Sequence, residues 1–217
     1  MNKVFLKFFK KESFDEICTG MFSDILDKMD YKNQVLTNWE INKNGNKVFG
    51  KVSNLSIETI SIDNENISQG LNYLASLGEG DILFVDGSMK FAYFGELMSR
   101  LSIEKKLSGI IINGLTRDSH FTMNSNLPIF SKGYSPKDIK GRGRVKEFEK
   151  DIIIDKTTIK HGDFVFGDSD SIVVIPHLIH DKVFKEVNIL INKEIKIKKL
   201  ILKGVSIENI LKETDEF

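Results

Sequence analysis

Apolar residues recur at helical spacing in the first part of the chain. Residues 12–30 carry them at Phe14, Ile17, Cys18, Met21, Ile25, Leu26 and Met29, which predicts a helix over this range. A second helix is predicted over 66–77, where Gly78 and Gly80 follow the last apolar position as helix-ending residues. Residues 95–107, GELMSRLSIEKKL, are amphipathic in the same way and predict a third helix.

Continuous apolar runs separate these helices. Residues 48–55, 81–86 and 108–113 are rich in strand-forming residues, and Gly87 and Gly114 end the last two runs. Strands that alternate with helices are typical of parallel strands joined by helical crossovers. We therefore expect the strands at 81–86 and 108–113 to be neighbours in a parallel sheet.

The second half of the chain has shorter strands and more turns. Strands are predicted at 127–130, 151–154 and 171–175, and 158–167 reads as a hairpin-rich stretch. Residues 179–213 return to helical spacing, and their lysine run is explained better by a solvated helix face than by a nucleic-acid patch. The pattern predicts one α/β domain over 1–217, with a mixed or layered sheet and helical N- and C-terminal segments.

Composition narrows the class of protein. Lys plus Arg equals Asp plus Glu at 31 each, so net charge gives no reason to expect nucleic acid as the main partner. No stretch approaches the roughly 20 apolar residues of a membrane span, and the start of the chain lacks the pattern of a signal peptide. The single cysteine, Cys18, cannot form an internal disulfide. We expect a cytoplasmic protein without a membrane partner.

A first candidate site lies where a strand gives way to a helix, at Gly95 and Glu96. The free N–H groups at a helix N-terminus attract carboxylates and phosphates, and a glycine allows close approach to the backbone. A plain turn with a helix-dipole acid explains the same residues.

The second candidate is the pair Arg117 and Asp118, which follows the strand at 108–113. Arginine presents a planar fork of donors to a carboxylate, and aspartate presents hard oxygen to a divalent cation such as Mg²⁺. A surface ion pair is the alternative. If the two strands are parallel neighbours, both candidates open at the same sheet edge, where Glu96 would face the Arg-Asp pair and His120 could line the same cleft.

Other catalytic patterns are missing from the sequence. No serine lies in a nucleophile-elbow pattern, and neither the dinucleotide-binding nor the Walker glycine motif occurs.

Five segments resemble one family throughout nearly the whole chain. They are TGMFSDILDKM, FGELMSRLSIEKKLSGIIINGLTRDS, LPIFSKGYSP, HGDFVFGDSDSIVVIP and KEIKIKKLILKGVSIENIL, of which the second is the most specific. They are similar to the family of 4-hydroxy-4-methyl-2-oxoglutarate aldolase and the regulator of ribonuclease activity A. The resemblance implies a layered β/β/α fold of the swivelling-domain type, usually assembled as a homotrimer or homohexamer.

The resemblance also implies a site. Gly95, Glu96, Leu97 and Met98 would hold a 2-oxo acid with backbone amides, Arg117 would bind the substrate, and Asp118 would be the one direct protein ligand to Mg²⁺ or Mn²⁺. Glu96 stands where the aldolases of this family commonly have aspartate, which leaves its part in proton transfer open. Glu96, Arg117 and Asp118 would be the catalytic residues.

The implied activity is that of a metal-dependent lyase. It would cleave a carbon–carbon bond of a 2-oxo acid through a metal-stabilised enolate, by retro-aldol cleavage to pyruvate, by oxaloacetate decarboxylation, or by both. Two alternatives remain: a non-catalytic regulator that binds an RNA-degrading enzyme, and an enzyme that applies the same chemistry to a sugar acid.

Overall fold

The computed structural model describes residues 3–60 and 67–214 of the chain. Within these ranges the main sheet has nine strands, in the order β1-β13-β12-β3-β4-β6-β8-β2, with β9 paired to β3. Its centre is parallel: β3 (Val48–Thr59) pairs with β4 (Asp81–Asp86), β4 with β6 (Gly109–Ile112), and β6 with β8 (Ile129–Ser131). The expectation of parallel neighbours at 81–86 and 108–113 is therefore confirmed.

The remaining strands of the sheet are antiparallel. On one side β12 (Phe164–Gly167) pairs with β3, β13 (Ile172–Ile175) with β12, and β1 (Val35–Leu36) with β13. At the other side β2 (Glu40–Ile41) pairs with β8, and β9 (Gly143–Phe148) runs along the far half of β3. The sheet is mixed because only its centre is built from helical crossovers.

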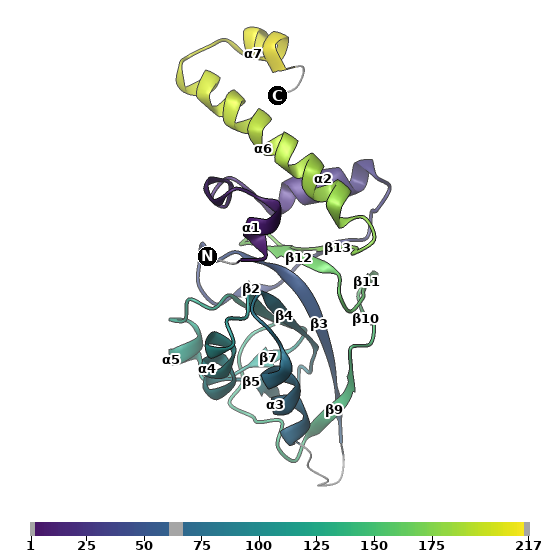
Figure 1. Ribbon diagram of the computed structural model, residues 1–217. Helices are drawn as coiled ribbons and strands as arrows, with labels where there is room; N and C mark the ends of the chain where they lie inside the picture. The colour runs from purple at the N-terminus through teal and green to yellow at the C-terminus, as the bar shows by residue number, and fades with distance from the viewer. Residues whose placement is uncertain (1–2, 61–66, 215–217) are drawn as a thin grey trace.

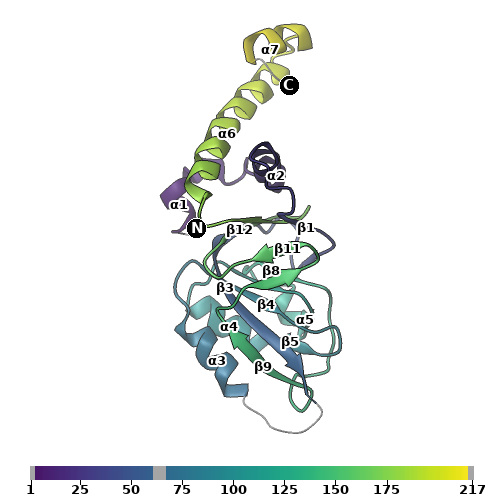
Figure 2. The same cartoon turned by 90° about the vertical axis from the view of Figure 1, so that its right-hand side faces the viewer.

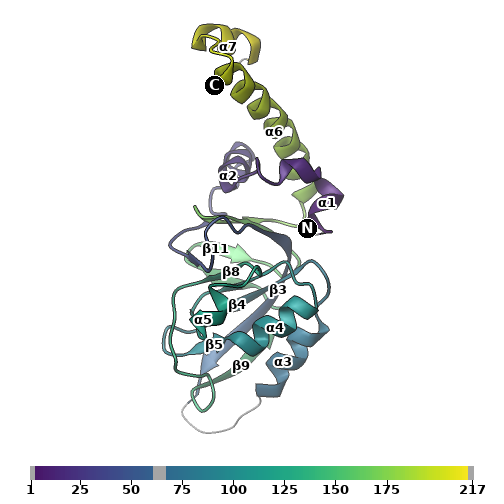
Figure 3. The same cartoon turned by 90° about the vertical axis from the view of Figure 1, so that its left-hand side faces the viewer.

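Helices α3 (Ile67–Ser76) and α4 (Glu96–Glu104) lie side by side over one face of the parallel strands (Figure 3). Because side chains alternate along a strand, Leu83 and Val85 of β4 point to this helical layer, where they join one apolar cluster with Leu74 and Met98. The two crossover helices form where the apolar spacing of 66–77 and 95–107 predicts, but Leu71, Leu97 and Ile103 are exposed. The buried residues of α4 are Ser99 and Ser102.

The opposite face of the same strands carries a separate core. Ile82 and Phe84 of β4 pack there with Val165 of β12 and with the hairpin of β10 (Ile152–Ile154) and β11 (Thr157–Ile159). In Figure 2 this hairpin lies across the sheet. The result is a strand layer on one face and helices on the other, so the layered α/β fold class is confirmed.

A third core, rich in phenylalanine, joins the two ends of the chain. It lies between the strands β12 and β13 and the helices α1 (Phe5–Phe8), α2 (Thr19–Lys28) and α6 (His180–Leu202). A short 3-10 turn, η1 (Lys11–Ser13), lies between α1 and α2 in the chain. Phe22 stacks on Phe166 with ring centroids 4.9 Å apart, and Phe49 on Phe164 at 6.0 Å. In Figure 1 the far half of α6 projects from the body and carries α7 (Ile207–Thr214) at its end.

No helix within residues 3–60 and 67–214 is long and apolar enough to cross a membrane.

The first predicted helix, over 12–30, is wrong at its start. Helix α2 begins only at Thr19, whose backbone N–H and hydroxyl both donate to the carboxylate of Asp168, at 2.8 and 2.9 Å. Before it, the ammonium of Lys47 donates to the carbonyl oxygens of Phe14, Asp15 and Ile17. Distant side chains thus bind the backbone groups that a longer helix would pair internally.

Other predicted segments are closer to the structure. Strand β3 continues past residue 55 to Thr59, because β9 pairs with its far half. The stretch 158–167 joins two hairpins, since β11 pairs with β10 and β12 with β13. The C-terminal region is helical, as predicted, and forms two helices separated near Gly204, whose φ is +71°. Asn66 of the second predicted helix lies outside the described residues.

Candidate functional site

Two short parallel strands bring the predicted site residues together. β5 (Ala92–Phe94) precedes Gly95, and β7 (Leu115–Thr116) precedes Arg117. The N–H of Arg117 donates to the carbonyl of Phe94 at 2.9 Å, so the two strand ends are tied side by side. Gly95 is the N-cap of α4, and the helix begins at Glu96.

Asp118 lies against the start of α4. Its Oδ2 accepts the backbone N–H of Glu96 at 2.9 Å and lies 3.5 Å from Nε of Arg117. Its backbone is left-handed, with φ 57° and ψ 47°, and it caps the short helix α5 (Ser119–Thr122). Aspartate is one of the few residues that adopt this conformation at modest cost. The carboxylate is 34% exposed and is therefore accessible to a ligand.

The contact between Asp118 and the start of α4 requires a residue without a Cβ at position 95. A Cβ at position 95 would lie 2.4 Å from Oδ2 of Asp118 and 2.8 Å from Cγ of Arg117. Its φ of −153° is ordinary extended backbone, so the constraint is the space beside Arg117 and Asp118 and not the conformation of the glycine. The two candidate sites therefore lie together, as the sequence predicts, but they follow the strands of the separate two-stranded sheet of β5 and β7 and not those of the main sheet.

Glu96 takes part through two different groups. Its amide N–H donates to Asp118, but its carboxylate contacts Arg100 of α4 and His120 of α5. Oε1 accepts hydrogen bonds from Nε and Nη2 of Arg100 at 2.9 and 2.7 Å, and Oε2 lies 3.5 Å from Nε2 of His120. The Arg100 guanidinium in turn lies 4.5 Å from the centre of the Phe121 ring. The expectation that Glu96 faces the Arg-Asp pair thus holds for its backbone, while its carboxylate is held by Arg100.

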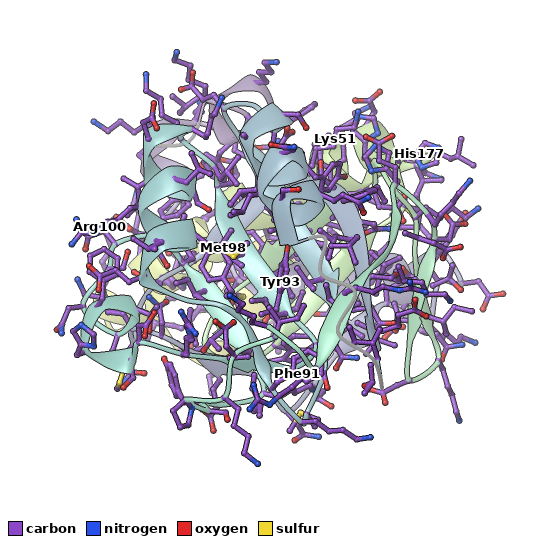
Figure 4. All side chains as sticks on the ribbon, turned by 90° about the horizontal axis from the view of Figure 1, so that it is seen from below. Lys51, Phe91, Tyr93, Met98, Arg100 and His177 are labelled. Atoms are coloured by element: carbon purple, nitrogen blue, oxygen red, sulfur yellow. The ribbon has the colours of Figure 1, made fainter. Side chains whose placement is uncertain are left out.

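Leu97 and Met98 form the first turn of α4 rather than a loop. Their backbone N–H groups have no hydrogen-bond partner within the described ranges, as expected near a helix start. The Leu97 side chain is 79% exposed, whereas Met98 packs inward beside Tyr93, with Arg100 at the outer edge (Figure 4). Burial raises the pKa of the Tyr93 phenol.

Asp138 is a site residue that the sequence pattern did not reveal. Its Oδ2 lies 2.8 Å from Nη1 of Arg117. The hollow beside it has a volume of about 330 Å³ and is lined by Arg117, Asp118, Ser119, His120, Tyr134, Ser135 and Pro136. A larger pocket of about 820 Å³ shares only His120 with this hollow. Because it contains neither Arg117 nor Asp118, volume alone does not locate the site.

The donors present fit a cation that is held mainly by water and substrate. Among the described residues no group of three or more His, Cys, Asp or Glu side chains is placed to bind a metal. One oxygen of Asp118 is bound by the Glu96 amide, while Oδ1 has no partner in the part of the chain described. Asp118 can therefore offer a single hard oxygen, which suits Mg²⁺, a cation that commonly keeps several waters.

Comparisons with known proteins extend this picture. Residues 22–174 match the model of the RraA-like family, described as Aldolase/RraA. A Bacillus anthracis protein named "Putative 4-hydroxy-4-methyl-2-oxoglutarate aldolase" is 31% identical over 137 residues, which cover 60% of this chain and 79% of that protein. A protein of the same name from Laribacter hongkongensis is 26% identical and covers 71% and 94%.

Crystal structures agree at the level of the fold. An uncharacterized protein from Pseudomonas syringae pv. tomato has a TM-score of 0.80 at 22% identity, with 92% of this chain and 94% of that chain covered. RraAS2 of Streptomyces coelicolor, described as an unusual member of the RNase ES inhibitor RraA family, has a TM-score of 0.71 at 21% identity and coverages of 80% and 87%. With the family model spanning most of its length, this chain belongs to the RraA-like family.

Proposed function

We propose that this protein is a divalent-metal-dependent lyase that cleaves a carbon–carbon bond of a 2-oxo acid. The reaction would be retro-aldol cleavage that releases pyruvate, decarboxylation of oxaloacetate, or both. The observation that carries the proposal is the contact of Asp118 with the Glu96 amide, beside the guanidinium of Arg117. Relatives named as aldolases support the same class of reaction.

Substrate binding is assigned to Arg117 and the start of α4. Arg117 offers a fork of N–H donors that matches a carboxylate. The unpaired amides of Leu97 and Met98 lie at the positive end of the helix dipole, where a carboxylate or a developing oxyanion is stabilised. A 2-oxo acid carries both groups on adjacent carbons, so one short substrate can engage both sets of donors.

Asp118 would hold the cation, either Mg²⁺ or Mn²⁺. When bound, such a cation acts as a Lewis acid toward the 2-oxo group and stabilises the negative charge that develops as the carbon–carbon bond breaks. The hydrogen bond from the Glu96 amide fixes the direction of the Asp118 carboxylate. The other oxygen of Asp118 is thereby presented to the ligand.

Glu96 is the group proposed to move a proton. Its carboxylate, held by Arg100 on one oxygen, would position a water and exchange a proton with it as general base or acid. The other oxygen, near His120 Nε2, is the one that can bind this water. Decarboxylation requires one proton on the product carbon, and this water would supply it.

The test measures pyruvate release from oxaloacetate and from 4-hydroxy-4-methyl-2-oxoglutarate. We expect turnover with Mg²⁺ or Mn²⁺ and its loss after chelation. Asp118→Asn keeps the size of the side chain and tolerates the left-handed backbone, so it isolates the charge. We expect it to reduce turnover by at least about 100-fold, because a direct ligand matters at least as much as the residues that orient one.

Asp155→Asn is the matched control. Asp155 also has a positive φ, of 54°, but it is exposed in the turn between β10 and β11. Its substitution should leave turnover unchanged. Equal rates for Asp118→Asn and the unmodified protein, with and without chelator, would exclude the metal role of Asp118.

Assembly as a homotrimer or homohexamer is part of the same proposal. Apolar side chains on the projecting part of α6 and on α7 are exposed in the single chain, among them Leu202 at 87% and Ile207 at 61%. Larger exposed apolar patches mark protein–protein interfaces. Light scattering coupled to gel filtration measures the molar mass, and a monomer would contradict this part of the proposal.

A ribonuclease-binding regulator is the second candidate. Its support is the fold match to RraA proteins, among them the RNA-processing inhibitor of Thermus thermophilis with a TM-score of 0.58 at 21% identity. A likeness at this identity carries the fold alone, and the Arg117–Asp118 site favours the enzyme. Tight ribonuclease binding together with no turnover of any 2-oxo acid would reverse the order.

A further inference from the structure

The backbone of Arg117 and the near part of its side chain are held by residues other than Asp138. Its backbone N–H is bound to Phe94, and its Nε lies 3.5 Å from Asp118. The glycine at position 95 leaves room for its stem, since a Cβ there would come within 2.8 Å of Cγ. These contacts fix the near part of the side chain without any help from Asp138.

Asp138 contacts only the far end of this arginine. Its Oδ2 lies 2.8 Å from Nη1, on the terminal fork that an incoming carboxylate would use. No partner of Nη2 is found in the described ranges. Asp138 therefore stands where a substrate would bind, and the placement of Arg117 does not depend on it.

The backbone around Asp138 is fixed to the site. Ala92 of β5 donates to the carbonyl of Lys137 at 2.7 Å and forms an isolated bridge with Asp138. Nearby, the N–H of Ser135 donates to Thr116 of β7 at 2.8 Å. The main chain thus holds the Asp138 side chain within reach of Arg117, while that side chain is 42% exposed and free to turn away into water.

Stability does not explain this pair. Exposed ion pairs contribute little to folding, since solvent screens them and two long side chains are ordered. The electrostatic effect on ligands is larger, because one guanidinium here meets two carboxylates, Asp118 and Asp138. A monoanion that approaches Arg117 must overcome the repulsion of both.

We propose that Asp138 is an exchangeable counter-ion of Arg117, which a substrate carboxylate displaces when it binds. The inference rests on the proposed function for the identity of the ligand, a 2-oxo acid. Asp138 occupies the arginine fork in the free site and gives it up by rotation of its side chain. Anions that bind too weakly to displace it are excluded, so Asp138 tunes which carboxylates are accepted.

The experiment measures pyruvate binding by isothermal titration calorimetry, with the chelator-treated protein and again with Mg²⁺. Asp138→Asn removes the competing charge and should bind pyruvate about five-fold more tightly in the metal-free arm, the size of effect expected for a partly exposed pair. Asp138→Glu retains the charge and should remain within about two-fold of the unmodified protein.

Glu58→Gln is the matched control. Glu58 forms an ion pair of the same kind with Arg144, at 2.6 Å, on β3 and β9. It should leave pyruvate affinity unchanged. A purely structural role for Asp138 predicts weaker binding in Asp138→Asn, so unchanged or weaker binding there overturns the proposal.

Turnover of oxaloacetate by the same preparations separates the two proposals. If the unmodified protein turns over oxaloacetate and Asp138→Asn shows no gain in affinity, the counter-ion role fails and the proposed function stands. If no protein turns over oxaloacetate and Asp138→Asn still binds pyruvate more tightly, the lyase function fails and the counter-ion role stands. No binding by any variant overturns both.

Discussion

Gly95→Ala is the substitution whose effect follows most directly from the geometry. The new methyl group would lie 2.4 Å from Oδ2 of Asp118 and 2.8 Å from Cγ of Arg117. An ordinary van der Waals contact with either atom requires a separation of at least 3.4 Å. The Asp118 carboxylate must therefore move by about 1 Å and the Arg117 stem by about 0.6 Å, and the hydrogen bond from the Glu96 amide to Asp118, now 2.9 Å, is broken.

Gly95→Ala is expected to reduce activity far more than stability. A displacement of about 1 Å in a positioned catalytic group costs about 100-fold in rate. A lost hydrogen bond to a charged group destabilises folding by about 1.5–3 kcal/mol where it is buried. Asp118 is a third exposed and can bind water instead, so we expect a stability loss of only about 1 kcal/mol.

Pyruvate release from oxaloacetate, coupled to lactate dehydrogenase, measures the activity, and urea unfolding measures the stability. Gly20→Ala is the control, because a Cβ at this exposed position in α2 meets only Cys18 Sγ at 3.7 Å. It should keep full activity and gain about 0.5–1 kcal/mol from helix propensity. Wild-type kcat/KM in a folded Gly95→Ala protein would refute the reasoning about this contact.

Three further substitutions test other parts of the structure. Glu96→Gln should lower kcat by about 100-fold and leave KM within about two-fold in steady-state assays, because it removes a proton-transfer group and retains the amide that binds Asp118; an unchanged kcat would exclude proton transfer by Glu96. Asp168→Ala should destabilise folding by about 1–2 kcal/mol in urea unfolding, since Thr19 loses both of its capping bonds; an unchanged midpoint would contradict the capping role. Burial, aided by the charge of Glu149, raises the pKa of Tyr73 to about 12, whereas the phenol of the unfolded chain titrates near 10. The contribution of Tyr73 to stability is therefore present below about pH 10 and is lost as the pH rises toward 12. The free energy of unfolding of Tyr73→Phe should fall less over that interval than that of the unmodified protein, and identical pH curves would contradict the assignment.

The sequence pattern was most informative where burial is one-sided or complete. The runs at 81–86 and 108–113 are apolar because both faces of the central parallel strands are covered. This pattern predicted that Arg117 and the start of α4 lie together, although the short strands β5 and β7 that carry them were not predicted. The family resemblance then singled out Asp118, among many aspartates, as the proposed metal ligand. Helix α4 was predictable in part for the same reason, since Met98 and Leu101 pack against one core, although Leu97 and Ile103 are exposed.

Contacts between distant segments escaped prediction. The start of α2 depends on Asp168 and Lys47, which lie far away in the chain. Asp138 reaches Arg117 only because an isolated bridge to Ala92 brings its segment back to β5. By contrast, the turn of the Glu96 carboxylate toward Arg100 could have been foreseen, because residues four apart on a helix are neighbours.

The left-handed backbone of Asp118 has an evolutionary consequence. Besides aspartate, the residues that keep this conformation cheaply are asparagine and glycine, and each is a single base change from an aspartate codon. Either replacement would leave the turn into α5 intact and remove the carboxylate. A lineage with this fold would therefore lose the proposed chemistry by drift without losing its shape, and asparagine or glycine at this position would mark the sequences in which that has happened.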